Sequence, residues 1–346
     1  EIRLSLVGSE MCIRDRLKIL TDIWALENKE AVSMYNFKEY VSREDRLAGG
    51  HRMCAGCGGT IAVRNVLKAI KPGDKAVVGN ATGCLEVSTF MYPYTAYKDS
   101  YIHNAFENAG ATMSGVEGAY NALRRKGKLD ETYKFITFGG DGGTYDIGFQ
   151  SLSGAMERGH DMVYVCYDNG AYMNTGIQRS SATPMFADTT TTPVGRESNG
   201  KPQYRKDLAA IIAEHQVPYV AQTTFVQNFR DLYKKSEKAI YTKGAAFLNI
   251  MAPCPRGWRY PTYDIMEICK LAVETRYWPL FEVVDGRWIL NYVPRNYVPI
   301  EEWLVKQGRF KHMFKPENEW MIEAFQKEVD RRWAELLNRC SETRGA

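Results

Sequence analysis

Two oxygen-bearing side chains, Asp141 and Asn169, stand where successive apolar runs end in glycine-containing turns. Asp141 lies inside the string FGGDGG that starts at Phe138, and Asn169 comes directly before Gly170. Glycine lets the backbone turn sharply and approach a bound group closely, while carboxylate and amide oxygens are hard metal ligands. This pattern predicts a clamp for a magnesium ion and a diphosphate.

A strand–helix–strand unit is needed to bring the two side chains together. Residues 134–138 and 162–167 read as buried strands, and residues 147–158 are long enough for the helix between them. In such a unit both strand ends and the helix start lie at one edge of a parallel sheet, where open α/β folds bind ligands. The helix start adds backbone N–H groups and the positive end of its dipole. We therefore expect an α/β fold with a mainly parallel, doubly wound sheet and helices on both faces.

The chain has eight cysteines, and their contexts differ. Without a signal peptide, a disulfide framework is not expected, and metal or redox use is. Cys166 and Cys269 lie in apolar segments and read as small buried residues. Cys340 reads as incidental, and Cys12, near the N-terminus, is expected to have no part in the chemistry.

Four other cysteines lie next to glycine or proline in loops. Cys54 and Cys57 form a CxxC before a helix expected over 60–70, Cys84 follows a strand expected over 76–79, and Cys254 follows the apolar run 245–251. Parallel-sheet topology places all four at the edge that carries the diphosphate clamp. Such a set can hold zinc or an iron–sulfur cluster, and the spacing does not choose between them.

Several strings resemble known motifs. GDG followed by the later asparagine resembles the thiamine diphosphate motif of transketolases and 2-oxoacid decarboxylases. A wider set resembles the β subunits of pyruvate:ferredoxin oxidoreductases, within the 2-oxoacid:ferredoxin oxidoreductase family. The set is HRMCAGCG at His51, NATGCLEV at Asn80, PYTA at Pro93, FENAGA at Phe106, GGDGGTYDIG at Gly139, DNGAYMNTGIQRSSATP at Asp168, APCPRGW at Ala252 and VKQGRFKHMF at Val305.

The resemblance implies the thiamine diphosphate-binding fold and a set of site residues. Asp141, Asn169 and the backbone carbonyl of Ala171 would hold Mg²⁺, and Asn174 would lie at the reacting ring as a catalytic residue. The diphosphate would be cradled by Gly140, Gly142, Gly143 and Thr144. Thiamine diphosphate turns a 2-oxo acid into a strong reductant, and a neighbouring 4Fe-4S cluster gives those electrons an exit. That favours iron–sulfur over zinc at Cys54, Cys57, Cys84 and Cys254.

The resemblance also implies partners. A separate α subunit would carry the pyrimidine-binding half of the site, γ and ferredoxin-like δ subunits would complete the complex, and this chain alone would be inactive. The implied reaction is the reversible oxidative decarboxylation of pyruvate with coenzyme A to acetyl-CoA and CO₂, with electrons passed to ferredoxin. Two alternatives stay open: the same chemistry on a branched-chain 2-oxo acid, 2-oxoglutarate or oxalate, and a zinc-stapled assembly module without catalysis.

Composition limits the other partners. A net charge of +4 with no long single-sign run argues against nucleic acid. No apolar run reaches the roughly 18 residues that span a bilayer, so we expect no membrane association and a soluble, cytoplasmic protein.

Four segments are expected along the 346 residues. Residues 1–16 resemble translated adapter read-through and are expected to be an artefact without structure. Residues 17–50 form an N-terminal extension, in which 17–30 is amphipathic. Residues 51–300 form the thiamine diphosphate-binding domain, and 301–346 form a helical arm that contacts another subunit, with a helix over 318–337.

The remaining candidates are polar or aromatic residues with two readings each. Asp146 and Gln178 either support the site or are ordinary loop residues, and His51 and Arg52 either lie near the cluster or face solvent. We expect Glu86 and His103 to be structural. The late aromatic residues Trp258, Tyr277, Trp278, Phe281 and Trp288 are interpreted as a subunit interface, with an ordinary core as the alternative. The polar loop 188–206 is expected to order against a partner.

Overall fold

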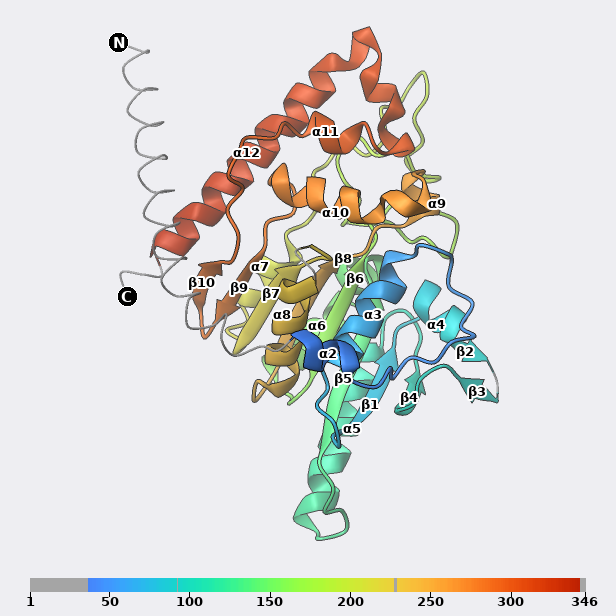
Figure 1. The fold of residues 1–346 in the computed structure, drawn as a ribbon, viewed down its shortest axis with the longest axis vertical. Coiled ribbons are helices and arrows are strands. Elements are labelled where there is room, and N and C mark those ends of the chain that lie inside the picture. The colour runs from blue at the N-terminus through green and yellow to red at the C-terminus, as the bar shows by residue number, and fades with distance from the viewer. Residues whose placement is uncertain (1–36, 92, 227–228, 343–346) are drawn as a thin grey trace.

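One sheet of eight strands organises the chain in a computed structural model that describes residues 37–91, 93–226 and 229–342 (Figure 1). The strand order is β10-β9-β7-β8-β6-β5-β1-β4. Six strands run parallel: β1 (Lys75–Asn80), β4 (Ser100–His103), β5 (Tyr133–Gly140), β6 (Val163–Asp168), β7 (Tyr219–Thr223) and β8 (Ala246–Met251). At one edge β9 (Phe281–Val284) and β10 (Arg287–Leu290) add an antiparallel pair. A separate small hairpin joins β2 (Phe90–Met91) to β3 (Tyr94–Thr95).

Helices cover both faces of this sheet. One face carries α3 (Gly58–Lys68), α8 (Arg230–Tyr241) and α10 (Ile265–Glu274), and the other carries α5 (Ala109–Arg125), α6 (Phe149–Glu157) and α7 (Leu208–Ala213). Side chains of β6 alternate between the two resulting apolar clusters. Val163, Val165 and Tyr167 join the first, whereas Tyr164 and Cys166 join the second. The predicted fold class, a mainly parallel α/β sheet with helices on both faces, is confirmed.

Short elements surround this frame. They are α2 (Phe37–Ser42), α4 (Cys84–Thr89), α9 (Pro255–Trp258), α11 (Glu301–Leu304), the 3₁₀ turns η3 (Thr262–Asp264), η4 (Gly308–Phe314) and η5 (Pro316–Asn318), and one π-helical turn, η1 (Gly142–Ile147). The helix expected over 147–158 therefore begins later, at Phe149, because the glycine-rich segment before it forms the wider π turn. Such turns are frequent at functional sites.

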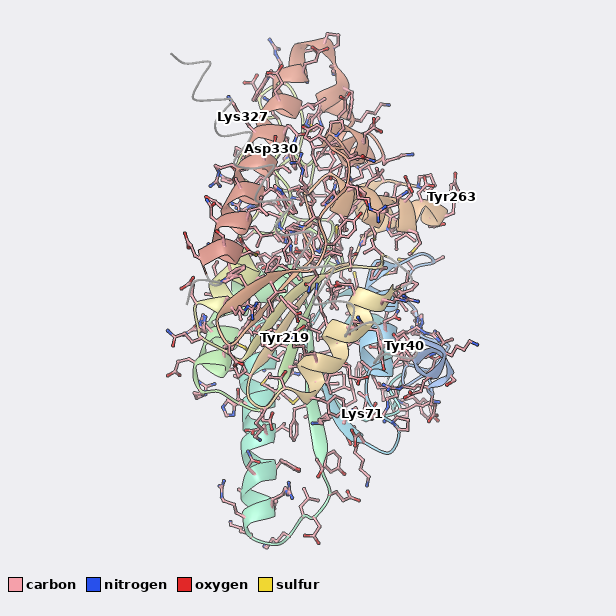
Figure 2. The ribbon with its side chains drawn as sticks, turned by 60° about the vertical axis from the view of Figure 1, so that its left-hand side comes forward. Tyr40, Lys71, Tyr219, Tyr263, Lys327 and Asp330 are labelled. Carbon is pink, nitrogen blue, oxygen red and sulfur yellow. The ribbon has the colours of Figure 1, made fainter. Side chains whose placement is uncertain are left out.

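The last helix, α12 (Glu319–Glu342), is longer than the expected 318–337. Its first half adds Met321, Phe325 and Val329 to one apolar cluster, and its second half adds Trp333 and Leu336 to the other. Figure 2 shows this helix, marked by Lys327 and Asp330, lying above the end of the sheet. The described part of the C-terminal segment is thus packed on the sheet of its own chain, and contact with another subunit stays a prediction.

The structure favours the core reading for the late aromatic residues. Trp258, Tyr277, Trp278, Phe281 and Trp288 are all at most 9% exposed, and they pack inside the chain. Interpreting them as an interface was wrong for the described chain, because helices and strands far apart in sequence cover them.

The polar loop 188–206 also packs against its own chain. Lys201 is 1% exposed, and its ammonium donates to the carbonyls of Ser181 and Thr183 at 3.2 and 2.6 Å.

Two expectations lie outside the described residues. The read-through segment 1–16 with Cys12 and the amphipathic stretch 17–30 both fall there. Among the described helices, none is long and apolar enough to cross a membrane.

Candidate functional site

The carboxyl ends of four neighbouring strands place the predicted ligands side by side. β1, β5, β6 and β8 are adjacent in the sheet, and the segments that follow them carry Cys84, Asp141, Asn169 and Cys254. The CxxC loop precedes α3 at the same edge, because the N–H of Gly58 donates to the carbonyl of Pro253 at 3.0 Å. The predicted convergence at one edge follows from strand adjacency, as expected for this topology.

Three oxygen-bearing groups meet between β5 and β6. One terminal atom of the Asn169 amide lies 2.8 Å from the carbonyl oxygen of Ala171 and 2.9 Å from Oδ1 of Asp141. In the cation-free chain this position suits the NH₂ group, which donates to both oxygens. With the amide turned over, three oxygens face one another.

The spacing of these groups fits magnesium. Adjacent oxygens around an octahedral Mg²⁺ with Mg–O of about 2.1 Å are roughly 3 Å apart, close to the two separations measured here. The donor set of one carboxylate, one amide and one carbonyl suits a hard cation that keeps few protein ligands.

The carboxylate of Asp141 is fully buried. Burial raises its pKa well above the usual value, and the nearby charge of Asp168 raises it further. Two donors oppose this rise, the Ser180 hydroxyl at 2.5 Å and the backbone N–H of Asn169 at 3.2 Å. A cation beside Asp141 would remove the cost of the buried negative charge.

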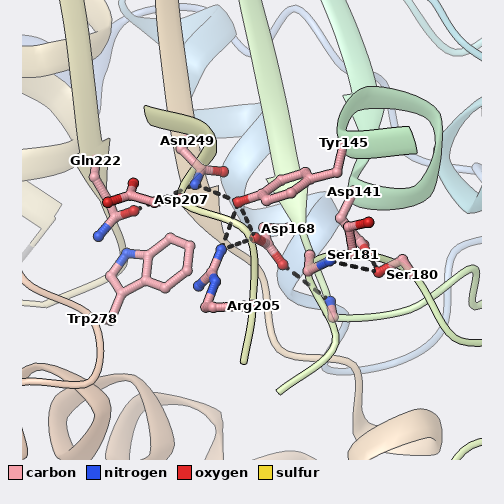
Figure 3. Close-up of polar contacts among 12 residues, drawn as sticks. Asp141, Tyr145, Asp168, Ser180, Ser181, Arg205, Asp207, Gln222, Asn249 and Trp278 are labelled. Atoms are coloured by element: carbon pink, nitrogen blue, oxygen red, sulfur yellow. Dashed lines mark hydrogen bonds and ion pairs between the residues drawn. The ribbon is translucent and has the colours of Figure 1, made fainter. Parts of the chain in front are cut away.

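Asp168 is engaged elsewhere (Figure 3). Its Oδ2 accepts from the Tyr145 hydroxyl at 2.7 Å and from Arg205 Nη2 at 2.5 Å, and Asn249 donates to Tyr145 at 2.8 Å. Its Oδ1 accepts from the N–H of Gly170 at 3.1 Å. Asp168 therefore fixes the turn that presents Asn169, and its charge is matched by Arg205.

A small, open pocket lies beside the clamp. The predicted residues that line it are Cys84, Gly140, Gly142, Gly143, Asn169, Ala171 and Asn174. Asn174 is exposed at this pocket. The first turn of a helix has backbone N–H groups without partners inside the helix, so the start of η1 suits an anionic group such as a diphosphate.

Glycine is required at this pocket for a packing reason. A Cβ atom at Gly142 would lie 2.3 Å from the Tyr172 ring, whose hydroxyl donates to the Gly142 carbonyl at 2.8 Å. Thr144, predicted in the diphosphate cradle, does not line the pocket. Its hydroxyl donates back to the carbonyl of Gly140 at 2.7 Å.

Three of the four predicted cluster cysteines stand at helix starts, and Cys54 is exposed in the loop before α3. Cys57 precedes α3, Cys84 is the first residue of α4, and Cys254 precedes α9 and accepts from the N–H of Gly257 at 3.3 Å. Gly58 allows the two loops to meet, since a Cβ atom there would lie 2.6 Å from the backbone of Ala252.

The four thiols lie close enough together to influence one another's pKa. Burial raises the pKa of the Cys84 thiol to about 12, and the other three thiols and Asp141 add to the rise. Burial likewise raises the pKa of Cys57 and of Cys254, and neighbouring thiols contribute in both cases. Thiolates here therefore need a positive centre to stabilise them. Within the described ranges, no three or more His, Cys, Asp or Glu side chains are close enough to hold a single metal ion.

The secondary candidates have mainly structural contacts. Glu86 is buried and lies 2.5 Å from Nδ1 of His103. Asp146 accepts from the N–H of Ser181 at 2.9 Å, and Gln178 accepts from the Thr175 hydroxyl at 2.7 Å, so both brace the loop after the clamp. The side-chain Nδ1 of His51 is buried without a hydrogen-bond partner.

Two residues that support the clamp from behind, Trp258 and Arg309, could not be recognised from the sequence. Trp258 donates from Nε1 to the carbonyl of Asn169 at 2.6 Å, and the guanidinium of Arg309 lies 3.9 Å from the centre of the Trp258 ring. Both residues belong to strings noted above, APCPRGW and VKQGRFKHMF, but their partners are distant in sequence. Tyr167 and Arg205 were missed for the same reason.

A second pocket lies away from the clamp, between β9, β10 and α12. It is rich in arginine, but Arg205, Arg276 and Arg332 pair with Asp168, Asp330 and Glu328. Its cations are thus largely engaged by carboxylates, and the chemistry-bearing residues gather at the smaller pocket.

Comparisons with known proteins agree with this geometry. Residues 79–250 match the family model described as thiamine pyrophosphate enzyme, C-terminal TPP binding domain. The chain is 51% identical to pyruvate synthase subunit PorB of Thermotoga maritima, covering 87% of this chain and 94% of the relative. It is 48% identical to PorB of Methanocaldococcus jannaschii, with coverages of 83% and 95%.

One further relative and one solved structure also match this chain. Ketoisovalerate oxidoreductase subunit VorB of Pyrococcus furiosus is 43% identical, with coverages of 85% and 93%. A solved 2-oxoglutarate:ferredoxin oxidoreductase from Magnetococcus marinus, with 2-oxoglutarate, coenzyme A and succinyl-CoA bound, matches with a TM-score of 0.51. At 21% identity, covering 62% of this chain and 71% of that one, it supports the fold alone.

Proposed function

Because this chain belongs to the family of pyruvate synthase PorB subunits and carries a thiamine pyrophosphate-binding domain, we propose that it is the β subunit of a pyruvate:ferredoxin oxidoreductase. The proposed reaction is oxidative decarboxylation of pyruvate with coenzyme A to acetyl-CoA and CO₂, with electrons passed through a 4Fe-4S cluster to ferredoxin. The observation that carries this proposal is that Cys84 lines the same pocket as the magnesium clamp.

The residues of the clamp have separate tasks in this proposal. Asp141, Asn169 and the Ala171 carbonyl would hold Mg²⁺, and backbone N–H groups of Gly142 and Gly143 would hold the diphosphate. When bound, thiamine diphosphate supplies the carbon nucleophile that attacks the 2-oxo group and keeps the electrons left by CO₂. Asn174 stands at the pocket, where its amide can donate to an oxygen of the bound substrate.

The four thiols support a cluster better than a zinc ion. The thiols of Cys54, Cys57 and Cys254 are near enough to Cys84 to raise its pKa, and Cys84 lines the pocket proposed for thiamine diphosphate. A zinc ion at this place would have no redox chemistry and could not accept electrons. A 4Fe-4S cluster at this place supplies one-electron acceptance next to the thiamine pocket.

The proposal includes partner subunits and a cellular site. A pyrimidine-binding α subunit would complete the thiamine site, and γ and ferredoxin-like δ subunits would carry electrons onward in the cytoplasm. The relatives named as subunits support a multisubunit assembly.

A second candidate is the same reaction on a branched-chain 2-oxo acid. The 43% identity to a ketoisovalerate oxidoreductase subunit keeps it open, while the higher identity to PorB chains favours pyruvate. Rates of ferredoxin reduction by the assembled complex with pyruvate, 2-oxoisovalerate and 2-oxoglutarate separate these substrates.

Replacing Cys54 by Ser in the assembled complex tests the cluster assignment. We expect loss of one 4Fe-4S signal and of ferredoxin reduction, because a serine oxygen is a poor replacement for a thiolate. Cys340→Ser is the control, since Cys340 is buried in α12 away from this pocket. Retained ferredoxin reduction with an intact cluster signal in Cys54→Ser sinks the assignment.

A further inference from the structure

Tyr167 fills the space between the thiol loops and the clamp. It is the next-to-last residue of β6, is 2% exposed, and lines the pocket together with Cys84 and Gly140. Its ring lies where side chains at two neighbouring loops would otherwise be. A Cβ atom at Gly83 would be 2.7 Å from the Tyr167 oxygen, and one at Gly140 would be 3.3 Å from it. Glycine at both positions therefore makes room for this hydroxyl.

The Tyr167 hydroxyl is buried and has no hydrogen-bond partner among the described residues. Its O–H group therefore lacks an acceptor. One end of the Asn169 amide faces Ala171 and Asp141, and no hydrogen bond joins Asn169 to this hydroxyl. Buried polar groups almost always have a partner, and one left without it is costly.

Both thiol loops approach Tyr167. Its hydroxyl oxygen lies beside Gly83, the residue directly before Cys84, and a Cβ atom at Gly59 would be 3.4 Å from the Tyr167 ring and 3.6 Å from the sulfur of Cys57. A thiolate sulfur can accept a hydrogen bond from such a hydroxyl, and hydrogen bonds to cluster sulfurs raise the reduction potential.

We propose that Tyr167 is a positioning residue whose hydroxyl donates a hydrogen bond to the sulfur of Cys84 when that sulfur ligates the cluster. This inference rests on the proposed function. The hydrogen bond orients Cys84 beside the thiamine pocket and stabilises the reduced, more negative cluster. Tyr167 thus links the strand that ends at the clamp with the loop that holds the electron acceptor.

The test is a redox titration of the anaerobically purified complex, followed by EPR, with Tyr167→Phe in this chain. Phenylalanine keeps the ring and removes only the donor. We expect the midpoint potential of one cluster to fall. The expected change in its reduction equilibrium constant is threefold to tenfold, which for a one-electron couple is a shift of at most about 59 mV. The other midpoints, the iron content and the affinity for thiamine diphosphate are expected to stay as in the unmodified complex.

Tyr40→Phe is the matched control (Tyr40 is labelled in Figure 2). Tyr40 is also 2% exposed and belongs to the same apolar cluster, but its hydroxyl donates to the Asn65 carbonyl on α3 at 3.1 Å. Removing it deletes a buried tyrosine hydroxyl away from the thiols, so all midpoints are expected to stay.

A second variant covers the case that Tyr167→Phe does not assemble. Gly83→Ala keeps the hydroxyl group but would place a Cβ atom 2.7 Å from its oxygen, so the hydroxyl and the loop that carries Cys84 must move apart. The same midpoint is expected to fall in this variant.

The outcomes separate this inference from the function it rests on. A cluster with an unchanged midpoint in Tyr167→Phe, or in Gly83→Ala where only that variant assembles, overturns the role of Tyr167 and leaves the cluster intact. Weaker thiamine diphosphate binding at an unchanged midpoint also overturns it and assigns the hydroxyl to the cofactor. A complex without iron at Cys84 overturns both proposals.

Discussion

Asp141 is the residue on which we expect cofactor binding to depend most. Its carboxylate is fully buried beside Asp168, whose own charge is matched by Arg205. Only Asp141 therefore brings an unmatched negative charge to the cradle formed with Asn169 and Ala171. A carboxylate in this environment is stable when a cation shares it.

Replacing Asp141 by Asn is expected to weaken magnesium-dependent binding of thiamine diphosphate by more than about 100-fold. Removing one partner of a buried charge pair costs about 3 to 5 kcal/mol, and each 1.4 kcal/mol is roughly tenfold in affinity. Calorimetric titration of the complex with cofactor and Mg²⁺ measures this. Asp207→Asn, at the start of α7, is the control because either side chain caps that helix. Unaltered binding in Asp141→Asn would refute the clamp.

The raised pKa of Asp141 gives the metal effect a pH dependence. Without a cation, the folded chain holds this proton more tightly than the unfolded chain, so the contribution of Asp141 to stability is present below the unfolded pKa and is lost as pH rises toward the higher folded pKa. Mg²⁺ binds the ionised form and competes with the proton. The rise in melting temperature caused by Mg²⁺ should therefore grow with pH, and Asp141→Asn should abolish that growth. A magnesium effect that is flat with pH contradicts this account.

Residue types could be predicted at this site, but their partners could not. Asp141, Asn169 and the four cysteines stand out because few other tasks need those residues beside glycine at strand ends. Tyr167 gives no such signal, since an apolar strand contains tyrosine for packing alone. Its role depends on Gly83 and Gly140, which the fold brings to it from two other segments.

At the scale of elements, adjacent parallel strands do most of the positioning. β1, β5, β6 and β8 were foreseeable as apolar runs, and their order in the sheet puts four functional loops in a row. The π turn η1 was not foreseeable, because a glycine-rich segment before a helix permits several turn types. The direction of the Thr144 hydroxyl, back to Gly140, follows from that turn.

The link between α9 and the clamp turn is a second element-level feature. Trp258 ends α9, shortly after Cys254, and its indole N–H bonds the Asn169 carbonyl at 2.6 Å. This hydrogen bond joins the segment that follows Cys254 to the loop proposed to bind the metal.

Trp258→Phe should destabilise the chain by about 1 to 3 kcal/mol, because it leaves the buried carbonyl of Asn169 without its donor. Trp303→Phe is a matched control: Trp303 is fully buried and neighbours Trp258, but its Nε1 has no hydrogen-bond partner. Denaturant unfolding of both variants measures the difference. Equal losses of stability would show that the hydrogen bond contributes nothing beyond packing.

At the scale of the whole molecule, the site occupies one edge of the sheet, while the connection between α5 and β5 projects from the opposite end (Figure 1). The described chain contains one sheet of eight strands, and one of its edges carries both the proposed diphosphate site and the thiols. Its fold was predictable from the alternation of strands and helices. The packing of α12 and the late aromatic residues was not, because segments of the chain far apart in sequence cover them.

The central claim is that one sheet edge holds a thiamine site and an iron–sulfur cluster together. Metal and sulfide analysis of the anaerobically purified complex, comparing Cys84→Ser with Cys340→Ser, tests it most directly. The account predicts that Cys84→Ser loses the iron and sulfide of one 4Fe-4S cluster and that Cys340→Ser loses none. Zinc in place of iron, or an unchanged iron content in Cys84→Ser, would contradict it.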